Sequence, residues 1–511
     1  MIASPRSERL TAVLLFLVLL ITYVYVFPRW ADPNQNSRLD MVAAVVDDGT
    51  FQIDKYVTNT VDYAKVGEHY YSDKAPGVAF IGIPVYAGLK LVLNLPIASA
   101  LTERLAHSSA FQSTLRENGT GVSEQKVHFA LGQVAIALVV GAIPSAILGV
   151  LIYLWLAHIT ANFWLHILAV LGYSLLTPAY AYANTLYGHQ LSAVLLFGAF
   201  YATSTARRPL PVPALLGVGV LLSYSVVTEY PTALIAGILY LYTFYRLHRL
   251  GQWKRITWVT LSAAAVAVSW MAYNTTVFGG PLNLGYSYSE LWVEKHQAGF
   301  MSLTLPRWDA IWGITFGAFR GLFALAPWLL LATPGFVIWW RSGELRTEFG
   351  VALASVIAIF LFNASSVMWW GGFSVGPRYL LPALPFLSLG TVFALRQWRD
   401  RLWLKVTLCA LFAWSFAATW GLTLAEQAFP PDTILNPFIE YALPNWLAGN
   451  IARNVGTIMG LRGAFSLIPL FVMLFVSIAV WRLLIGRVGV AAARDAAAEA
   501  AFRAEAKYSG P

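Results

Sequence analysis

The residues best suited to chemistry lie in one polar segment, from Arg29 to Lys126, which separates a first hydrophobic stretch from a long series of others. This segment holds eleven of the 25 acidic residues: Asp32, Asp40, Asp47, Asp48, Asp54, Asp62, Glu68, Asp73, Glu103, Glu117 and Glu124. Its densest part ends at residues 70–77, YYSDKAPG, in which Asp73 adjoins Lys74. A carboxylate can take a proton while a neighbouring cation holds an anion. The segment therefore predicts acid–base chemistry beside an anionic group.

Three cations are placed to bind that anion. Lys74 precedes an apolar helix, and Arg320 and Arg378 stand at the ends of hydrophobic stretches. A guanidinium can hold a lipid phosphate through two hydrogen bonds, and a lysine can hold it as a point charge. Ordinary contact with phospholipid is the alternative for each of the three, because long cationic side chains also reach the membrane surface without a specific ligand.

The candidates for a general base are aspartates of the same segment, with Asp40 first, and then Asp73, Asp32 and Asp54. Asp40 has an alternative role, because Ser37-x-x-Asp40 is close to a capping box, in which the acid satisfies amides at a helix N-terminus. Asp73 has another, because it can simply pair with Lys74.

Aromatic and glycine-rich segments, residues 277–288 and 369–379, combine tight turns with faces that suit a sugar ring, although such residues also form interfacial belts without a ligand. Ionisable groups at the ends of hydrophobic stretches are costly and so mark candidate sites. The predicted substrate-binding residues are Asn34, Arg38, Tyr71, His189, Glu229, Trp370 and Tyr379. The eight histidines show no metal-ligand spacing. No cofactor is predicted, and a divalent cation held by aspartates is left open.

The composition is that of a polytopic membrane protein. Hydrophobic residues make up 58% and charged residues 12% of the chain, and the mean hydropathy is +0.62; soluble domains carry about 25% charged residues. The net charge of +9 is scattered among hydrophobic stretches, which argues against nucleic acid as a partner and fits the excess of cations in cytoplasmic loops. The single cysteine, Cys409, excludes an intramolecular disulfide.

About twelve stretches are long and apolar enough to be candidate transmembrane helices. They are Leu10–Phe27, Val127–Ala157, Phe163–Tyr180, Leu191–Thr203, Val212–Val226, Pro231–Tyr245, Trp258–Tyr273, Leu322–Trp340, Val351–Phe362, Leu380–Leu395, Val406–Leu424 and Phe465–Trp481. The first is predicted to be a retained anchor, because no small-residue cleavage site follows it.

The basic loops indicate the orientation. Every second loop is basic apart from a short turn near His158, so both termini are predicted to be cytoplasmic. Four loops then lie outside: 29–126, 275–320, 366–379 and 426–462. The predicted organisation is one all-α transmembrane domain, residues 1–485, which includes the large outer loop 29–126 and is followed by a cytoplasmic tail, residues 486–511.

Two helices are predicted inside the first outer loop. Residues 37–48 place Leu39, Val42 and Val46 on one side, and Gly49 ends the helix. Residues 78–93 form an apolar helix broken by Pro84, and we expect it to lie flat on the outer membrane surface.

With these motifs the chain resembles the C-type glycosyltransferase (GT-C) superfamily, in particular protein O-mannosyltransferases and lipid A aminoarabinose transferases. Residues 37–48 are similar to the family's first-loop helix, Gly49-Thr50-Phe51 to its Gly-Asp-Trp-like turn, residues 73–76 to its lysine motif, and residues 377–382 to its late Arg-Tyr-x-x-Pro segment. The likeness covers most of the chain in layout, but only these short motifs are specific. In one place the chain departs from the pattern: Asn34-Gln35 stands where the family has an Asp-Glu pair, and His189 falls near a family aspartate.

The resemblance implies an integral glycosyltransferase of the bacterial cytoplasmic membrane with its active site facing outside. It would move a sugar from a polyprenyl-phosphate-linked donor to the hydroxyl of a lipid, glycan or protein acceptor, with inversion and an aspartate as base. Lys74 would contact the lipid phosphate. Two alternatives are open: a transporter or lipid flippase, which would place ionisable groups inside its spans, and a non-catalytic binding relative, which Asn34 would explain.

Overall fold

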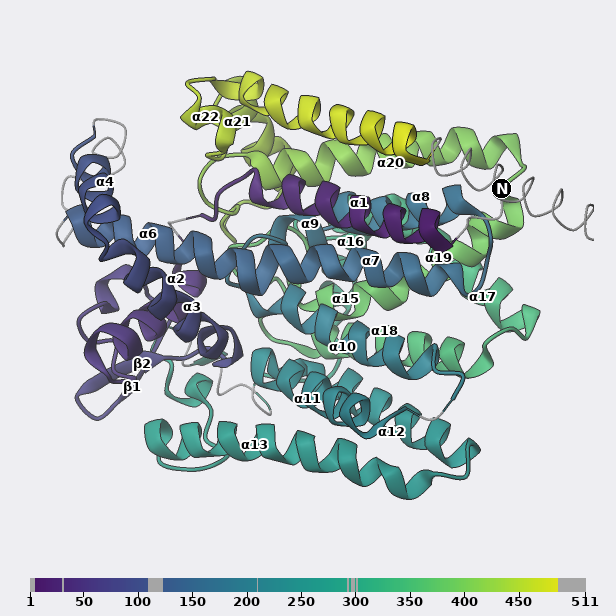
Figure 1. Ribbon diagram of the computed structural model, residues 1–511, viewed down its shortest axis with the longest axis horizontal. Coiled ribbons are helices and arrows are strands. Elements are labelled where there is room, and N and C mark those ends of the chain that lie inside the picture. The colour runs from purple at the N-terminus through teal and green to yellow at the C-terminus, as the bar shows by residue number, and fades with distance from the viewer. Residues whose placement is uncertain are drawn as a thin grey trace, which may run out of the picture.

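The computed structural model describes residues 5–29, 32–108, 123–208, 210–291, 294–295, 299 and 302–485. The predicted tail, residues 486–511, lies outside them. Most of the described chain is helical (Figure 1). The long helices run side by side, and the elements of the first loop pack across one end of the bundle. Helix α1 begins, and the helix of residues 463–485 ends, at the opposite end of the bundle.

The helical elements of the bundle follow in chain order. They are α1 (Pro5–Val24), α6 (Ser123–Ala137), η3 (Leu138–Ala142), α7 (Ile143–Ala157), α8 (Phe163–Leu175), α9 (Ala179–Tyr182), α10 (Gly188–Ser204), α11 (Val212–Thr228), η4 (Tyr230–Thr232), α12 (Ala233–Arg249), η5 (Trp253–Arg255), α13 (Ile256–Phe278), η6 (Gly285–Tyr288), α15 (Trp308–Thr315), α16 (Leu322–Leu325), η7 (Pro327–Leu331), α17 (Ala332–Ser342), α18 (Arg346–Ser365), η8 (Arg378–Ala383), α19 (Leu384–Trp398), α20 (Leu402–Leu424), η9 (Phe438–Ala442), α21 (Leu443–Leu447), α22 (Val455–Ile458) and η10 (Gly463–Leu467).

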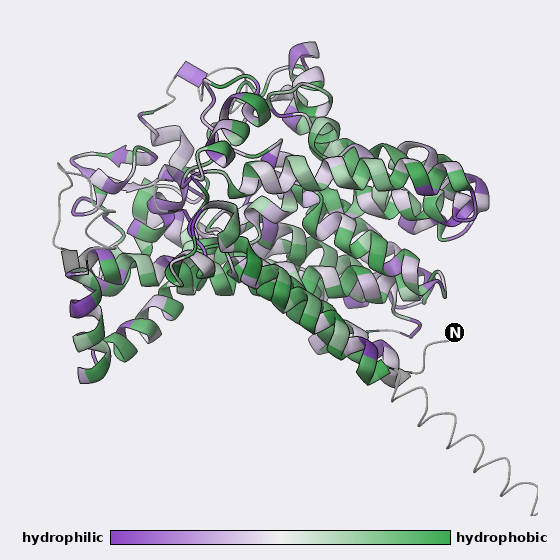
Figure 2. Ribbon diagram, turned by 90° about the horizontal axis from the view of Figure 1, so that it is seen from above, coloured by the Kyte–Doolittle hydropathy of each residue, from purple (hydrophilic) through white to green (hydrophobic). Residues whose placement is uncertain are grey.

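Small residues let these helices approach closely. A Cβ atom at Gly219 of α11 would strike the carbonyl group of Val259 in α13, and one at Gly335 of α17 would strike that of Gly390 in α19. Interfaces of this kind are typical of membrane helices, whose apolar side chains gain little by leaving lipid. Figure 2 shows the long helices largely in the colour of hydrophobic residues.

By length and composition, seven helices of the described residues could cross a membrane, or eight if the bent pair α3 (Gly77–Leu93) and α4 (Pro96–Ala106) counts as one span. This supports a polytopic membrane protein. The count of about twelve stays a prediction, since α8 and α11 are apolar but only 13 and 17 residues long. The predicted span Leu322–Trp340 is wrong as a single helix. It is divided into α16, η7 and α17 because Pro327 has no N–H to continue the first helix.

The first loop contains α2 (Pro33–Ala43), η1 (Ala44–Asp48), η2 (Val57–Asn59), β1 (Tyr63–Val66), β2 (His69–Ser72), α3 (Gly77–Leu93) and α4 (Pro96–Ala106). The antiparallel hairpin β1–β2 corrects the prediction of an all-α chain. Helix α3 is also continuous through Pro84, which corrects the predicted break. Packing holds this helix together, because Gly82 lies against Val42 and Tyr86 lies against Gly132.

The predicted helix of residues 37–48 is confirmed, but it begins earlier. Asp32 is its N-cap and accepts hydrogen bonds from the N–H groups of Asn34 and Gln35. Gly49 ends the helix with a φ of 69°, a left-handed conformation that favours glycine. The capping role suggested for Asp40 is therefore wrong, because Asp40 lies in the second half of α2.

Asp40 is fully buried, and only one of its carboxylate oxygens has a partner, Asn59 Nδ2 at 3.2 Å. Burial raises the pKa of Asp40 well above its usual value, and the hydrogen bond from Asn59 opposes this only in part. A group whose pKa is higher in the folded state stabilises the fold most at low pH, and this contribution is lost as the pH rises through that pKa.

We therefore expect Asp40→Asn to raise the unfolding temperature of the purified protein at pH 8, where folding of the wild type must either bury a charge or take up a proton. The difference should shrink as the pH falls toward 5. Asp48→Asn is the matched control, because Asp48 pairs with Lys55 at the surface and its replacement should bring no gain. A lower unfolding temperature for Asp40→Asn at pH 8 would show that the buried charge is stabilising.

Candidate active site

All four predicted outer loops meet at one cavity of about 260 Å³ at the first-loop end of the bundle. Its lining includes Asp32 and Lys74 from the first loop, Tyr286 from the second, Arg378 from the third and Asp432 from the fourth. The sequence orientation placed these loops on one side of the membrane, and the fold brings them to one place.

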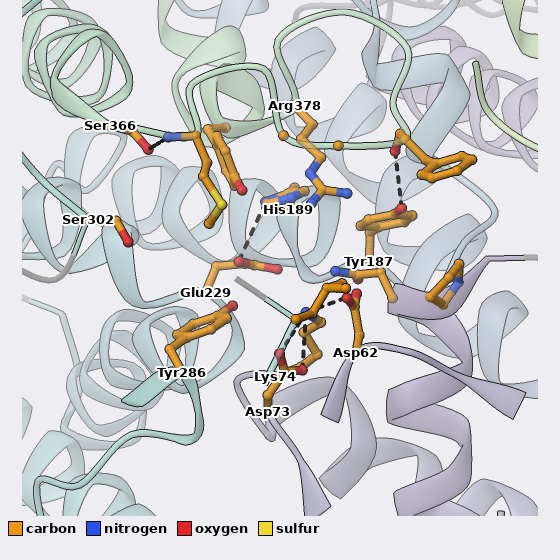
Figure 3. Close-up of a pocket in the computed structure, with 18 of the residues that line it drawn as sticks. Asp62, Asp73, Lys74, Tyr187, His189, Glu229, Tyr286, Ser302, Ser366 and Arg378 are labelled. Carbon is orange, nitrogen blue, oxygen red and sulfur yellow. Dashed lines mark hydrogen bonds and ion pairs between the residues drawn. The ribbon is translucent and has the colours of Figure 1, made fainter. Parts of the chain in front are cut away.

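Most of the predicted site residues line this cavity. They are Asp32, Asn34, Arg38, Asp73, Lys74, His189, Glu229, Trp370, Arg378 and Tyr379. Figure 3 shows Lys74, Asp73 and Asp62 together in the lower part of the view, with His189, Glu229 and Arg378 above them.

Lys74 lies between two carboxylates. Its Nζ atom is 3.0 Å from Asp62 Oδ2 and 3.1 Å from Asp73 Oδ1, and the exposed fraction of the lysine side chain is only 8%. Burial favours the neutral amine, but the charges of Asp62 and Asp73 outweigh it and raise the pKa of Lys74. Burial also raises the pKa of Asp73, and Lys74 counteracts that shift. The three groups together carry one negative charge when all are ionised.

A second ion pair forms the wall between α2 and the end of α11. Arg38 Nη2 lies 3.2 Å from Glu229 Oε1, and His189 Nδ1 lies 3.6 Å from the other oxygen of Glu229. The second Nη of Arg38 donates to both oxygens of Asn34. The amide at position 34 is therefore an acceptor for this guanidinium, and the Arg38–Glu229 pair is neutral.

Arg378 differs from the other two cations of the cavity, because no carboxylate of the described residues lies within ion-pair distance of it. Its guanidinium lies 4.9 Å from the centre of the Tyr187 ring and 5.4 Å from that of Tyr379. Gly371 backs the side chain, since a Cβ atom there would come within 3.0 Å of Arg378 Nε. The cavity thus has one buried cation to which an anionic ligand could bind.

Asp32 is held by donors on both oxygens. In addition to the helix amides, Gln35 Nε2 donates to it at 3.0 Å and the Tyr187 hydroxyl at 2.9 Å. Burial raises the pKa of Asp32, and the bonds from Gln35 and Tyr187 oppose this. Gln35 also accepts a bond from the N–H of Leu186, so it ties α2 to the start of α10.

Four predicted site residues do not line the cavity. Asp40 is buried beside Asn59, Asp54 pairs at the surface with His69, and Tyr71 packs against Phe278. Arg320 is only 1% exposed, and its guanidinium donates to backbone carbonyl groups of Phe319, Trp370, Gly372, Pro430 and Pro431. It joins the loop that carries Arg378 to the fourth outer loop.

Sequence reasoning did not assign seven polar lining residues to the site: Asp62, Tyr187, Tyr286, Ser287, Ser302, Ser366 and Asp432. Asp432 accepts a hydrogen bond from the Trp370 indole at 3.1 Å. Two signals were available, because Asp62 is an acid in the loop that was already singled out and Tyr286 lies in the aromatic segment 277–288.

Replacing Arg320 tests its position. We expect Arg320→Ala to destabilise the protein by at least about 2 kcal/mol, because several buried carbonyl groups lose their donor. Arg320→Lys should recover part of this, since an ammonium offers three donors instead of five. Thermal unfolding of the purified protein measures both, with the exposed Arg307→Ala as control. An unchanged unfolding temperature together with lost affinity for a lipid phosphate would make Arg320 a direct ligand.

Known proteins give little guidance on identity. No family model and no curated protein matches the chain. Among solved structures, one match is ArnT from Cupriavidus metallidurans bound to undecaprenyl phosphate. The sequence identity is 15% and the TM-score 0.44, over 94% of this chain and 72% of that one. A likeness of this degree assigns no family and no activity, and the function must be argued from the cavity.

Proposed function

We propose that this chain is a membrane glycosyltransferase. It moves a sugar from a polyprenyl-phosphate-linked donor to an acceptor hydroxyl, with inversion, at the outer face of a bacterial cytoplasmic membrane. The observation that carries the proposal is the pairing of charges in the cavity. Among the described residues no carboxylate lies within ion-pair distance of Arg378, whereas two carboxylates share Lys74, so an anion and a base have separate places in one cavity.

The phosphate of the donor would bind at Arg378. A guanidinium donates two parallel hydrogen bonds to a phosphate, and in a buried cavity this bond is stronger than in water. Lys74 contributes a second positive charge, but Asp62 and Asp73 already share it. Arg378 is therefore the first phosphate contact and Lys74 the second, which reverses their order in the sequence-based expectation.

The proton of the acceptor hydroxyl would pass to an outer-loop aspartate beside Lys74. Asp32 is less suited, because its oxygens already accept four hydrogen bonds. Lys74 opposes the rise in the pKa of Asp73 that burial causes. A carboxylate can accept a proton only in its ionised form. Aspartate as base agrees with the chemistry that the sequence motifs imply.

The rest of the lining suits a sugar linked to an isoprenoid. Tyr286, Trp370 and Tyr379 offer aromatic faces, and Leu303, Phe362 and Met368 offer apolar surface. Sugar rings stack on aromatic faces, and an isoprenoid chain needs an apolar one. The acceptor is a lipid, glycan or protein hydroxyl.

Replacing Arg378 tests the phosphate contact. We expect Arg378→Ala to raise the KM for a radiolabelled polyprenyl-phosphate sugar by about 10- to 100-fold, the value of one charged hydrogen-bonded contact. Arg378→Lys should recover part of the affinity. The exposed Arg307→Ala is the control and should leave KM unchanged. Equal donor affinity in all four proteins would contradict the proposed phosphate contact.

Replacing Lys74, together with assays of the wild type, distinguishes a glycosyltransferase from a binding protein and from a flippase. Lys74→Ala should abolish transfer, because two like-charged carboxylates then face each other and one takes up a proton. The measurement is release of labelled sugar from the donor. Unchanged turnover in Lys74→Ala would end this role. Donor binding without any turnover by the wild type would indicate a binding protein, and movement of intact donor between leaflets of a vesicle would indicate a flippase.

A further inference from the structure

The register of the hairpin places two aspartates opposite each other. Tyr63 pairs with Ser72 in the ladder, so Asp62 and Asp73 are the next residues beyond the open end of the hairpin. Like charges directly across two strands destabilise each other. Lys74, the next residue in the chain, resolves this by placing its ammonium between the two carboxylates.

The two aspartates are not equivalent. The Asp73 side chain is 2% exposed, and both of its oxygens face Lys74, at 3.1 and 3.2 Å. Gly285 closes over it, since a Cβ atom there would lie 2.8 Å from Asp73 Cα. The Asp62 side chain is 15% exposed, and it lines the same cavity. Asp73 lines the cavity as well, but Asp62 is the more exposed of the two and therefore the more accessible to a ligand.

The loop that carries Asp62 is fixed against the wall of the cavity. The N–H of Asp62 donates to Thr60 Oγ1 at 3.0 Å, and the Thr60 hydroxyl donates to the carbonyl oxygen of Pro33 at 2.7 Å. Pro33 is the first residue of α2, and it also lines the cavity. A carboxylate held in this way is positioned before any ligand binds, which lowers the entropic cost of reaction.

The other carboxylates of the cavity have different tasks. Asp32 caps α2 and holds the Tyr187 hydroxyl, Glu229 neutralises Arg38, and Asp432 holds the Trp370 indole. Asp62 is ion-paired with Lys74 alone, and it shares that cation with Asp73.

We propose that Asp62 is the catalytic base, and that Lys74 and Asp73 position it; this rests on the proposed glycosyl transfer. A lone pair of the acceptor oxygen forms the new bond to the anomeric carbon of the sugar. The electrons of the bond from that carbon to the phosphate oxygen leave with the phosphate. The proton of the acceptor hydroxyl goes to the Asp62 carboxylate and then to water.

The shared lysine gives this transfer a favourable charge balance. Before reaction, the three groups carry one net negative charge. After Asp62 has taken the proton, Lys74 and Asp73 are left as a neutral pair at 3.1 Å. The reaction therefore leaves no unpaired charge among the buried groups, which would cost several kcal/mol. Asp73 thus contributes without touching the acceptor.

The test compares water, a nucleophile that must lose a proton, with azide, which has none to lose. We expect Asp62→Ala and Asp62→Asn to lower kcat for hydrolysis of radiolabelled undecaprenyl-phosphate sugars at least about 100-fold, the usual contribution of a general base. Azide needs no base, so added sodium azide should restore consumption of the donor by Asp62→Ala and yield the glycosyl azide with inverted configuration. KM for the donor should stay within about threefold of that of the wild type.

Control variants distinguish a role of Asp62 as base from a purely structural role. Asp48→Asn, a surface aspartate paired with Lys55, should behave as the wild type. Asp62→Glu keeps the carboxylate and should keep more activity than Asp62→Asn. The wild-type rate should fall at low pH as the base takes up a proton, and this fall should be absent in Asp62→Asn. The comparison does not depend on the variant's stability in detergent, because the variant molecules that stay folded lack the titrating carboxylate.

The outcomes distinguish the two proposals. If the wild type consumes no polyprenyl-phosphate sugar, the proposed function falls and the role of Asp62 falls with it. If the wild type is active and Asp62→Asn retains its kcat and the fall in rate at low pH, only the role of Asp62 falls. Loss of hydrolysis that azide does not restore would also overturn it, since a structural defect removes both reactions.

Discussion

The whole arrangement depends on pairing charges where little water reaches them. An ionised group that is buried without a partner costs several kcal/mol, so each charge in the cavity needs an opposite charge or strong donors nearby. Lys74 meets this need for two carboxylates at once, and Arg38 meets it for Glu229. Arg378 lies over the rings of Tyr187 and Tyr379, and no carboxylate of the described residues is within ion-pair distance of it. That imbalance distinguishes a binding cavity from a set of structural salt bridges.

The same interactions hold the first loop on the bundle. Asp32 caps α2 and binds Tyr187 near the start of α10, while Gln35 bonds to both Asp32 and the backbone of Leu186. Arg320 fixes the loop of Trp370 to the fourth outer segment through carbonyl groups. Asp32 and Arg320, which the sequence suggests as ligand-binding residues, therefore have a structural role: they hold the loops in place. They set the positions of Lys74 and Arg378, which lie on segments about 300 residues apart in the chain.

Composition and loop charge predicted the membrane class and the four segments that meet at the cavity, because both follow from transfer free energies that each segment carries by itself. Whether an individual acid is buried or lines the cavity could not be predicted in this way. Asp40 and Asp62 lie in one loop and have the same chemistry, yet one is buried beside Asn59 and the other lines the cavity. The hairpin register decides the position of Asp62, and the turn at Gly67 that sets this register was not recognised. The role of Arg320 could not be predicted either, because only tertiary packing determines whether a guanidinium donates to carbonyl groups or binds a ligand.

The amide at position 34 acquires a physical meaning in this setting. Asn34 accepts from Arg38, which leaves Glu229 as the carboxylate partner of that guanidinium and keeps the pair neutral. A carboxylate at position 34 would add a negative charge beside Glu229, and one of the two would then have to take up a proton or lose its share of Arg38. Asp62 is instead matched by Lys74, which follows the hairpin and which Asp62 shares with Asp73. A base at position 62, unlike one at position 34, does not compete with Glu229 for Arg38, so neither ion pair must break for the other to act.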